Sequence, residues 1–455
     1  MEINPENAVF IVLSFEGPDV YSMAGGLGAR ITHLTQTLAG GGFQVHHFFI
    51  GDPQKEGLEK TWDGKLLLHR WCQWISRYHP IGVYDGEEGK LNDFNGSAPD
   101  FIVRQIAMPA VAEGRKVIIL GEEWHTAEAM SRISDLLKDL GIRSRVIMFW
   151  NANNTYSFER INWPRLTGSA TITTVSKYMK QIMMEMGINP VVITNGIQKD
   201  FLKPVDKKHV ATLRKLLGSD LVLSKVARWH PDKGWSSAIR AVDRLKRNGR
   251  KCVLLARGSR EAYGNRVAYE AKTLDLVMKD IVLKGDPKEL YNNALLEGDF
   301  SPYFEAMSGN GQGDILNLTF PVPYNFLQAV YKASDMVLAN SSHEPFGLVG
   351  LEAMATGAVV FTGCSGEDYA THMNNAIVLD SFSPEEIEHY ILHLQEHPER
   401  RTIISRAARR TAEKWIWEEV VKDLICKLEY QSVLQGMVSR KGESDPVKES
   451  ESDSF

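Results

Sequence analysis

The amino-acid sequence predicts an α/β protein in which two doubly wound parallel sheets form separate domains. Three observations lead to this fold class. Short runs rich in valine, isoleucine and phenylalanine recur along the chain, helical patterns lie between several of them, and the runs fall into two series. Strands that alternate with helices form parallel sheets covered on both faces. At 455 residues the chain has the length of two or three domains, so each series predicts one domain.

The first series of predicted strands lies in residues 1–200. Helical patterns separate several of these strands, as in residues 27–39 and 127–141. The predicted strands are residues 8–14, 43–50, 116–121, 145–150, 170–176 and 191–196.

The second series of predicted strands lies in residues 201–412. We expect the join within residues 194–208, where glycine, proline and lysines interrupt the pattern. An irregular insertion is expected at residues 291–319. The predicted strands are residues 221–228, 251–258, 280–285, 335–340, 358–363 and 376–380.

The C-terminal segment is expected to divide into a helix and a tail. Residues 413–436 predict a long helix. In residues 437–455 the sequence after Ser439 holds five acidic and three basic residues, with Val447 as its one aliphatic side chain. Such a composition cannot form a core, so this tail is predicted to be disordered.

Charge and cysteine content limit the kinds of function. The formal net charge of −5 and the isoelectric point near 6.3 give no electrostatic reason to expect nucleic acid or an anionic membrane as a partner. No apolar run reaches the length of a membrane span, and the N-terminus does not read as a signal peptide. The cysteines are widely spaced and form no CxxC pair, so they predict neither disulfides nor zinc; they are Cys72, Cys252, Cys364 and Cys426. We therefore expect a cytoplasmic protein.

The stretch HEPFGLVGLEAMATG, residues 343–357, places two carboxylates in a nearly apolar strip. Glu344 falls in the predicted loop before a helix. On that helix Glu352 shares a face with Leu348 and Ala355, and this face points inward. A buried carboxylate needs partners, which could be a structural arginine or a ligand bound at the start of the helix. The motif by itself leaves both interpretations open.

Two further motifs favour phosphate groups. Gly25, Gly26 and Gly28 follow the first predicted strand and precede a helix, where backbone amides can approach a phosphate, although a plain tight turn would use the same residues. The loop matches neither the dinucleotide GxGxxG nor the Walker pattern. Arg228 and Lys233 flank a strand-to-helix turn and could converge on a diphosphate, or could be ordinary surface charges.

Taken together, the motifs resemble the retaining glycosyltransferases of the GT-B fold, specifically glycosyltransferase family 4 and its neighbours, the bacterial glycogen and starch synthases. This resemblance implies two Rossmann-like domains that face a central cleft, an N-terminal one for the acceptor and a C-terminal one for the nucleotide sugar, with the helix at 413–436 returning to the first. Four segments carry it, in the family's order: AGGLGARITHL (24–34), TVSKYMKQIM (174–183) with ITNGI (193–197), RWHPDKG (228–234) and EPFGLVGLEAMATG (344–357).

The resemblance also implies roles for the motif residues. Glu352 would bind the ribose hydroxyls, and Glu344 would lie beside the donor sugar. Arg228 and Lys233 would neutralise the leaving diphosphate, a differential role because negative charge grows there in the transition state. The glycine loop would contact the nucleotide sugar. The turn before the helix would meet the sugar and phosphates through the backbone of Phe346, Gly347 and Leu348.

The sequence also departs from the glycogen synthases. They usually carry KxGGLG, and here Met23 takes the place of the lysine. Their HDW-H-like motif reads GEEWHT here, with Glu122 in place of the first histidine and His125 kept. His125 could serve the reaction on the acceptor side or could be a structural histidine. These departures weigh against glucan synthesis but leave the donor residues unaffected.

The expected protein is a retaining, metal-independent glycosyltransferase without a cofactor. It would move a hexose, with glucose the first expectation, from a UDP- or ADP-sugar to a hydroxyl of an acceptor carbohydrate, either a glucan or a small sugar or sugar phosphate. Aromatic and amide side chains in the N-terminal half, such as Trp71 and Asn153, could contact that acceptor or serve packing. The alternatives are a UDP-sugar epimerase, a glucan phosphorylase and a catalytically silent nucleotide-sugar sensor.

Overall fold

The computed structural model describes residues 2–258, 261–309, 313–363, 365 and 367–437. By contacts the chain forms two compact units, residues 1–174 with 421–455 and residues 175–420. The sequence placed the join at 194–208, so the contact division comes earlier in the chain. The predicted domain limits stay a prediction, and the predicted tail lies, except for Met437, outside the described residues.

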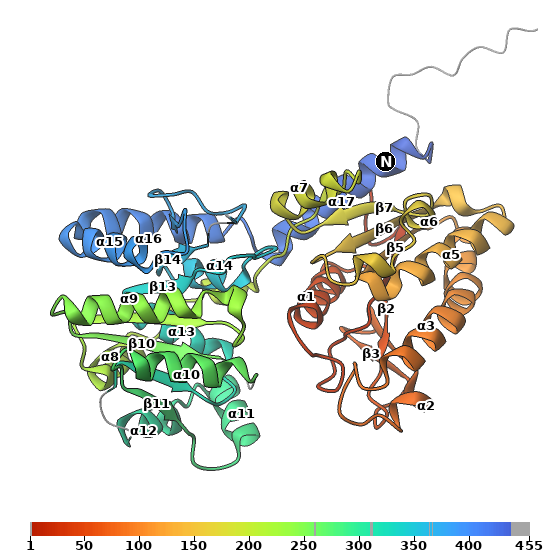
Figure 1. Ribbon diagram of the computed structural model, residues 1–455. Helices are drawn as coiled ribbons and strands as arrows, with labels where there is room; N and C mark the ends of the chain where they lie inside the picture. Colours follow the sequence, from red (N-terminus) through yellow and green to blue (C-terminus); the bar gives the residue numbers. More distant parts are fainter. Residues whose placement is uncertain (1, 259–260, 310–312, 364, 366, 438–455) are drawn as a thin grey trace, which may run out of the picture. The chain divides into compact units, whose positions relative to one another are not determined.

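The first unit is built on a mainly parallel sheet (Figure 1). Strand β3 runs antiparallel to β4, and the other paired neighbours from β4 to β7 are parallel. Its strands are β1 (Ala8–Leu13), β2 (Gln44–Ile50), β3 (Leu58–Thr61), β4 (Leu66–Trp71), β5 (Lys116–Glu122), β6 (Val146–Ala152) and β7 (Thr171–Thr174), in the order β3-β4-β2-β1-β5-β6-β7. The short strand β8 (Val191–Val192) falls within the residues of the second unit. The order reverses at β1, and ligands bind parallel sheets beyond the carboxyl ends of the strands at such a point.

Helices follow most strands of this unit. One long helical stretch runs from α3 through a π-helical segment, Ile102–Ala107, into α4. The helices are α1 (Gly26–Gly40), α2 (Gln73–Ser76), α3 (Glu87–Phe101), α4 (Met108–Ala112), α5 (Ala127–Asp139) and α6 (Trp163–Thr167).

The second unit holds a seven-stranded sheet whose paired strands are all parallel. Its strands are β9 (Leu221–Val226), β10 (Cys252–Arg257), β11 (Met278–Ile281), β12 (Ile315–Leu318), β13 (Met336–Ala339), β14 (Val359–Thr362) and β15 (Ile377–Val378), in the order β11-β12-β10-β9-β13-β14-β15. Its helices are α7 (Lys177–Glu185), α8 (Lys207–Leu217), α9 (Trp235–Arg247), α10 (Tyr263–Thr273), α11 (Pro287–Glu297), α12 (Ser301–Gly309), α13 (Tyr324–Ala333), α14 (Leu348–Ala355), α15 (Pro384–Glu396) and α16 (Pro398–Ala412), and α17 (Trp417–Leu434) begins in it.

Successive strand residues of the second unit enter different cores, as a doubly wound sheet requires. Leu221 and Leu223 pack against helices α9, α15 and α16, whereas Val222 packs against α8 and α13 on the other face. Because side chains alternate across a strand, both faces are buried only when the whole run is apolar. This explains why the strands could be recognised as unbroken apolar runs.

The predicted irregular insertion at 291–319 is wrong. This stretch contains the end of α11, the helix α12 and the strand β12. Tyr303 and Met307 of α12 are buried in the core formed with α8 and α13. The prediction failed because the glycine-rich sequence after α12 indicates an irregular segment. Tertiary packing of its apolar side chains stabilises α12, and a local sequence pattern contains no information about such packing.

Candidate functional site

The turn between β9 and α9 carries the two cations predicted from the sequence. The Arg228 side chain is exposed, and its guanidinium makes no ion pair with any described residue. Its backbone carbonyl accepts a 2.8 Å hydrogen bond from Trp235 Nε1 at the start of α9. Gly234 closes the turn with a φ of +65°, and a Cβ there would lie 2.1 Å from the Asn340 carbonyl oxygen. A glycine is therefore needed for this turn to approach the loop after β13.

That approach joins the two predicted donor motifs. Lys233 Nζ lies 2.9 Å from Glu344 Oε2, although 111 positions separate the residues in the sequence. The Ser342 amide also donates to the Asp232 carbonyl at 2.7 Å, which holds the two loops together through the backbone. Both strands end at the same edge of the parallel sheet, so the pair stands where ligands bind in this architecture.

A buried lysine that the sequence analysis did not single out anchors the same loops. Lys225 is 1% exposed, and its Nζ donates to the Leu338 carbonyl and to Asn340 Oδ1. Asn340 Nδ2 in turn donates to the Gly234 carbonyl at 3.1 Å. Burial, with a smaller contribution from Lys233, lowers the pKa of Lys225 to about 7. The sequence signal was a lysine inside the apolar run LVLSKVAR, since a charge within a buried strand needs partners.

Glu352 lies half-buried on α14, among neighbours that are fully buried. It forms no ion pair with an arginine among the described residues, so the structural-arginine interpretation has no support there. Burial raises the pKa of Glu352 to about 7, and the nearby Tyr331 hydroxyl lowers it in part. The Tyr331 hydroxyl is itself buried, and no described residue lies in hydrogen-bonding geometry with it. The pair thus offers a carboxylate and a hydroxyl that a ligand could satisfy.

The turn before α14 is fixed by packing. Gly347 has a φ of +77°, and its carbonyl accepts a hydrogen bond from the Tyr369 hydroxyl. Phe346 is buried against the rings of Tyr369 and Trp415. Leu348 begins the helix. The Phe346 side chain is therefore a packing anchor, and contacts to a ligand from this turn would have to come from backbone groups.

Glu367 is a second carboxylate at this edge of the sheet, and the sequence analysis missed it. Both carboxylate oxygens are buried, and no residue that the structure describes hydrogen-bonds them with normal geometry. Burial raises its pKa to about 8, with Glu344 adding to the effect. A Cβ at Gly347 would lie 2.7 Å from Glu367 Cγ, so this glycine gives the carboxylate its space. A lone glutamate after a strand gave no pattern by which it could be recognised.

In the first unit the predicted glycine loop is not open. The amides of Ala24, Gly25 and Gly28 all donate to Glu16 Oε2, at 2.9, 2.9 and 3.1 Å. Of the three glycines that the sequence assigned to the nucleotide sugar, Gly25 and Gly28 therefore donate their amides to a carboxylate of the chain itself, whereas the Gly26 amide is not among the donors to Glu16. A Cβ at Gly26 would meet open space.

His125 is enclosed by aromatic rings. It lies 4.2 Å from the Phe15 ring and 3.9 Å from the Trp124 ring, centroid to centroid, and Nε2 lies 2.8 Å from Glu87 Oε1. Burial lowers the pKa of His125 to about 3, so the imidazole is neutral at physiological pH. Its Nδ1 atom is buried and has no hydrogen-bond partner in the described part of the chain. This packing favours the structural interpretation of His125 over the catalytic one.

The two glutamates before it are held firmly. Glu122 accepts hydrogen bonds from Arg30, from Asn151 at 2.9 Å and from Asn153 at 2.8 Å. Glu123 adopts φ 65° and ψ 167°, a conformation almost restricted to glycine. Burial raises the pKa of Glu123 to about 8, against the opposing effect of the Asn153 amide. Strain of this kind concentrates at functional sites, which points to the carboxyl ends of β5 and β6.

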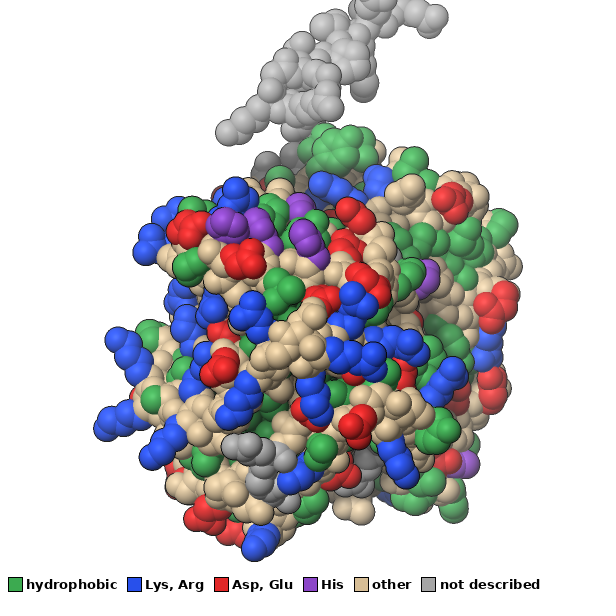
Figure 2. Space-filling view, turned by 60° about the vertical axis from the view of Figure 1, so that its left-hand side comes forward, with side chains coloured by type: hydrophobic (Ala, Val, Ile, Leu, Met, Phe, Trp, Pro, Cys, Tyr) green, Lys and Arg blue, Asp and Glu red, His purple; other side chains and the backbone are tan. Residues whose placement is uncertain are grey.

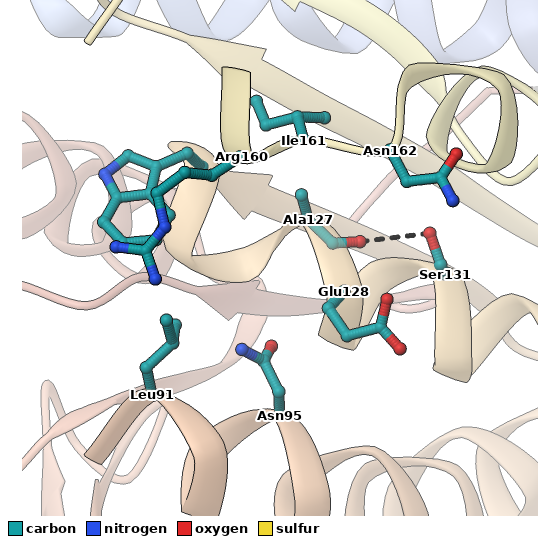
Figure 3. A pocket seen from close by; sticks show the side chains of 9 residues that line it. Leu91, Asn95, Ala127, Glu128, Ser131, Arg160, Ile161 and Asn162 are labelled. Atoms are coloured by element: carbon teal, nitrogen blue, oxygen red, sulfur yellow. Dashed lines mark hydrogen bonds between the residues drawn. The ribbon is translucent and has the colours of Figure 1, made fainter. Parts of the chain in front are cut away.

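A cavity of about 130 Å³ lies beside this segment, between α3, α5 and the loop before α6 (Figure 3). Its polar walls are Asn95, Ser131 and Asn162, which the view shows around the labelled Glu128. Glu128 is paired with Arg165 at 2.8 Å, so the cavity has little net charge. It has room for about four water molecules.

Comparison with known proteins adds the family. Residues 298–411 match the family model described as Glycosyl transferases group 1. The chain contains a group 1 glycosyltransferase domain. This matched segment holds Glu344, the turn at Phe346, Glu352 and Glu367, whereas Arg228 and Lys233 precede it.

Similar proteins extend the likeness beyond the group 1 domain. A D-inositol 3-phosphate glycosyltransferase of Salinispora tropica is 35% identical over 101 residues, which is 22% of this chain and 21% of the relative. The match therefore spans about a fifth of that relative's length. The structure of sucrose-phosphate synthase from Thermosynechococcus elongatus superposes with a TM-score of 0.63 at 15% identity, covering 94% of this chain and 100% of that one. Anabaena HepE in complex with UDP-glucose superposes with a TM-score of 0.58 at 16% identity, covering 93% and 99%. The chain has the GT-B fold, as predicted.

Two further properties of the chain complete its description. The face shown in Figure 2 carries lysine and arginine side chains interspersed with aspartate and glutamate. Among the residues that the structure describes, no helix combines the length and the apolarity needed to cross a membrane.

The buried Lys225 predicts a pH dependence of stability. Its folded pKa of about 7 is below the ordinary 10.5, so between these values unfolding takes up a proton and wild-type stability rises with pH. We expect the free energy of unfolding of Lys225→Met, minus that of wild type, to fall by about 1.4 kcal/mol per pH unit from pH 7 to 10. Urea titrations across this range measure it. A difference that stays constant would mean that Lys225 remains charged in the folded protein.

Proposed function

We propose that the chain is a retaining, metal-independent hexosyltransferase that moves glucose or another hexose from a UDP- or ADP-sugar to a hydroxyl of an acceptor carbohydrate. The observation that carries this proposal is the meeting of Lys233 with Glu344 at the carboxyl ends of β9 and β13, next to the helix that bears Glu352. The complex of HepE with UDP-glucose supports a UDP-sugar as the donor.

The proposed reaction needs positive charge at the leaving group. The bond between the anomeric carbon and the diphosphate breaks, the acceptor oxygen bonds to this carbon, and the acceptor proton leaves with the diphosphate. Negative charge therefore grows on the diphosphate in the transition state. Lys233 and the exposed guanidinium of Arg228 would stabilise this charge, and Glu344 orients Lys233 at 2.9 Å.

Glu352 would bind the ribose. Its carboxylate lacks an arginine partner among the described residues and lies near the unsatisfied Tyr331 hydroxyl. Two vicinal hydroxyls could donate to such a carboxylate and favour its charged form. The backbone at Gly347 and Leu348 would contact the sugar and phosphates, since Phe346 and Tyr369 fix its path.

The test is incubation of the full chain with labelled UDP-glucose and ADP-glucose, with and without acceptor carbohydrates and with EDTA. Nucleotide release that depends on the acceptor and persists in EDTA supports the proposal, and NMR of the product's anomeric proton checks retention. Interconversion of UDP-sugars without acceptor would indicate an epimerase instead. Tight binding without any turnover would indicate a sensor.

Removing the leaving-group cation should slow the chemistry. We expect Lys233→Ala to lower kcat by about a hundredfold or more, since preorganised charge at a developing anion has effects of this size. Lys246→Ala is the matched control, because Lys246 also forms a 2.9 Å ion pair in this unit, with Asp314. Steady-state kinetics with saturating donor measure both. Equal turnover in the two variants would make Lys233 an ordinary surface cation.

Glu352 should make donor binding depend on pH. Ribose hydroxyls donate to the ionised carboxylate, and its pKa of about 7 leaves it protonated in more acidic solution. The Kd for UDP-glucose should therefore rise about tenfold per pH unit as pH falls from 7 to 5.5, because binding must release one proton. Isothermal titration calorimetry measures this, and Glu352→Gln should flatten the profile.

The control for this measurement is Glu388→Gln, which changes another buried glutamate of the same unit, on α15. It should keep the wild-type pH profile. If Glu352→Gln bound UDP-glucose with unchanged affinity at every pH, the ribose assignment would be refuted.

A further inference from the structure

The Glu16 carboxylate occupies the N-terminus of α1 as a bound anion would. One of its oxygens accepts hydrogen bonds from the Ala24, Gly25 and Gly28 amides, and the other accepts one from the Tyr84 hydroxyl at 2.6 Å. The side chain is 4% exposed. Free amides at a helix N-terminus bind the oxygens of phosphates in the same way. Glu16 therefore stands where a ligand's phosphate could otherwise bind.

The loop is shaped for this carboxylate. A Cβ at Gly28 would lie 2.9 Å from Glu16 Oε2 and 3.0 Å from Met23 Cγ, whereas a Cβ at Gly25 or Gly26 would meet open space. Gly28 is thus the glycine that the packing requires, because a side chain at this position would collide with Glu16. Because the Tyr84 hydroxyl donates to the second oxygen, hydrogen bonds fix both oxygens of the carboxylate.

Cations near this edge of the sheet are engaged within the chain. Arg30 contacts Glu122 through two nitrogens, at 3.2 and 3.3 Å. Lys90 donates to the Tyr21 hydroxyl and to two backbone carbonyls. Arg160 pairs with Glu88 at 2.8 Å and covers the Trp124 ring. A phosphate arriving here would meet two arginines already paired with glutamates, a lysine that already donates to a tyrosine and to backbone carbonyls, and the Glu16 carboxylate.

Further carboxyl groups gather around the same tyrosine. Burial raises the pKa of Tyr84 far above its ordinary value, and Glu16, Glu123 and Glu87 add to this effect in that order. The strained Glu123 precedes His125 by two positions, and Asn95, which lines the nearly uncharged cavity, donates its Nδ2 to the His125 carbonyl at 3.2 Å. The carboxyl group of Glu123, largely protonated at neutral pH, and the Asn95 amide can exchange hydrogen bonds with hydroxyls, whereas the Glu16 carboxylate repels anions.

We propose that Glu16 is a specificity-determining residue: by filling the amides at the start of α1 it makes the first unit select an acceptor that presents uncharged hydroxyls and reject a phosphorylated one. The inference rests on the proposed glycosyl transfer and specifies its acceptor class as a neutral polyol. It separates this chain from relatives whose names contain phosphorylated compounds.

The first test compares acceptors in pairs. Glucose, fructose and myo-inositol are each offered to the wild-type chain with UDP-glucose, alongside the corresponding monophosphate ester. We expect kcat/KM for each ester to be at least about tenfold below that of its parent, because the Glu16 carboxylate repels the phosphate group. A phosphate ester used about tenfold better than its parent would overturn the proposal. If no compound of any pair accepts sugar while donor binding is normal, the proposed glycosyl transfer is refuted. The second test then still decides whether Glu16 blocks phosphate binding.

The second test measures inorganic phosphate binding to the full chain by NMR of ¹⁵N-labelled glycine amides. Wild type should show no saturable shift of Gly25 or Gly28. Glu16→Ala should open the cradle and bind phosphate, with these amides shifting, whereas Asp100→Ala should not. Asp100 is the matched control, since it is a carboxylate of the same unit in an exposed ion pair with Arg104, and its loss changes net charge equally.

Glu16→Gln keeps the shape of the side chain and removes its charge. This variant replaces Glu16→Ala in the experiment if the alanine variant does not fold. It should weaken the discrimination against phosphate esters without abolishing use of the neutral parents. Saturable phosphate shifts at Gly25 and Gly28 in wild type, or no phosphate binding in folded Glu16→Ala, would each refute the role assigned to Glu16.

Discussion

The close approach of two loops in the second unit is the constraint on which its site depends. Gly234 and Asn340 lie so near one another that any side chain at position 234 would collide with the Asn340 carbonyl. Lys225 Nζ donates a hydrogen bond to Asn340 Oδ1, and Asn340 Nδ2 donates one to the Gly234 carbonyl. These contacts bring Lys233 and Glu344 together. The ion pair between Lys233 and Glu344, which come from two distant motifs, thus depends on the buried Lys225.

Carboxyl groups near the two predicted ligand loops differ in their hydrogen-bond partners. In the first unit Glu16 and Glu122 have their oxygens satisfied by amides, a tyrosine and Arg30. In the second unit no described residue hydrogen-bonds the Glu367 carboxylate with normal geometry, and Glu352 lies beside a Tyr331 hydroxyl that likewise has no such partner among the described residues. Unsatisfied buried polar groups are costly, and functional sites are where proteins retain them. This difference agrees with the proposal that the second unit binds the donor.

The segment GEEWHT keeps one histidine of the motif that it resembles, but the surroundings of this histidine are those of a packing residue. His125 is present, yet rings enclose it and its pKa of about 3 keeps it neutral. The unusual group there is Glu123, whose backbone conformation glycine would adopt more easily. The protein holds this strain because the Asn153 amide binds the Glu123 carboxylate at 2.6 Å. Neither property can be read from the order of the residues.

The sequence by itself determined the fold class and the donor motifs. Strands that are buried on both faces appear as unbroken apolar runs, and the spacing of Glu344 and Glu352 placed the second on a helical face. Both are local properties, because they depend on neighbours within a few turns. Tertiary structure decided the rest. It paired Lys233 with Glu344 across 111 positions, buried Lys225 and Glu367, and gave helix α12 a core to pack against. It also filled the glycine loop with Glu16, since hydrogen bonds between residues distant in the sequence follow from how elements pack, and periodicity carries no information about them.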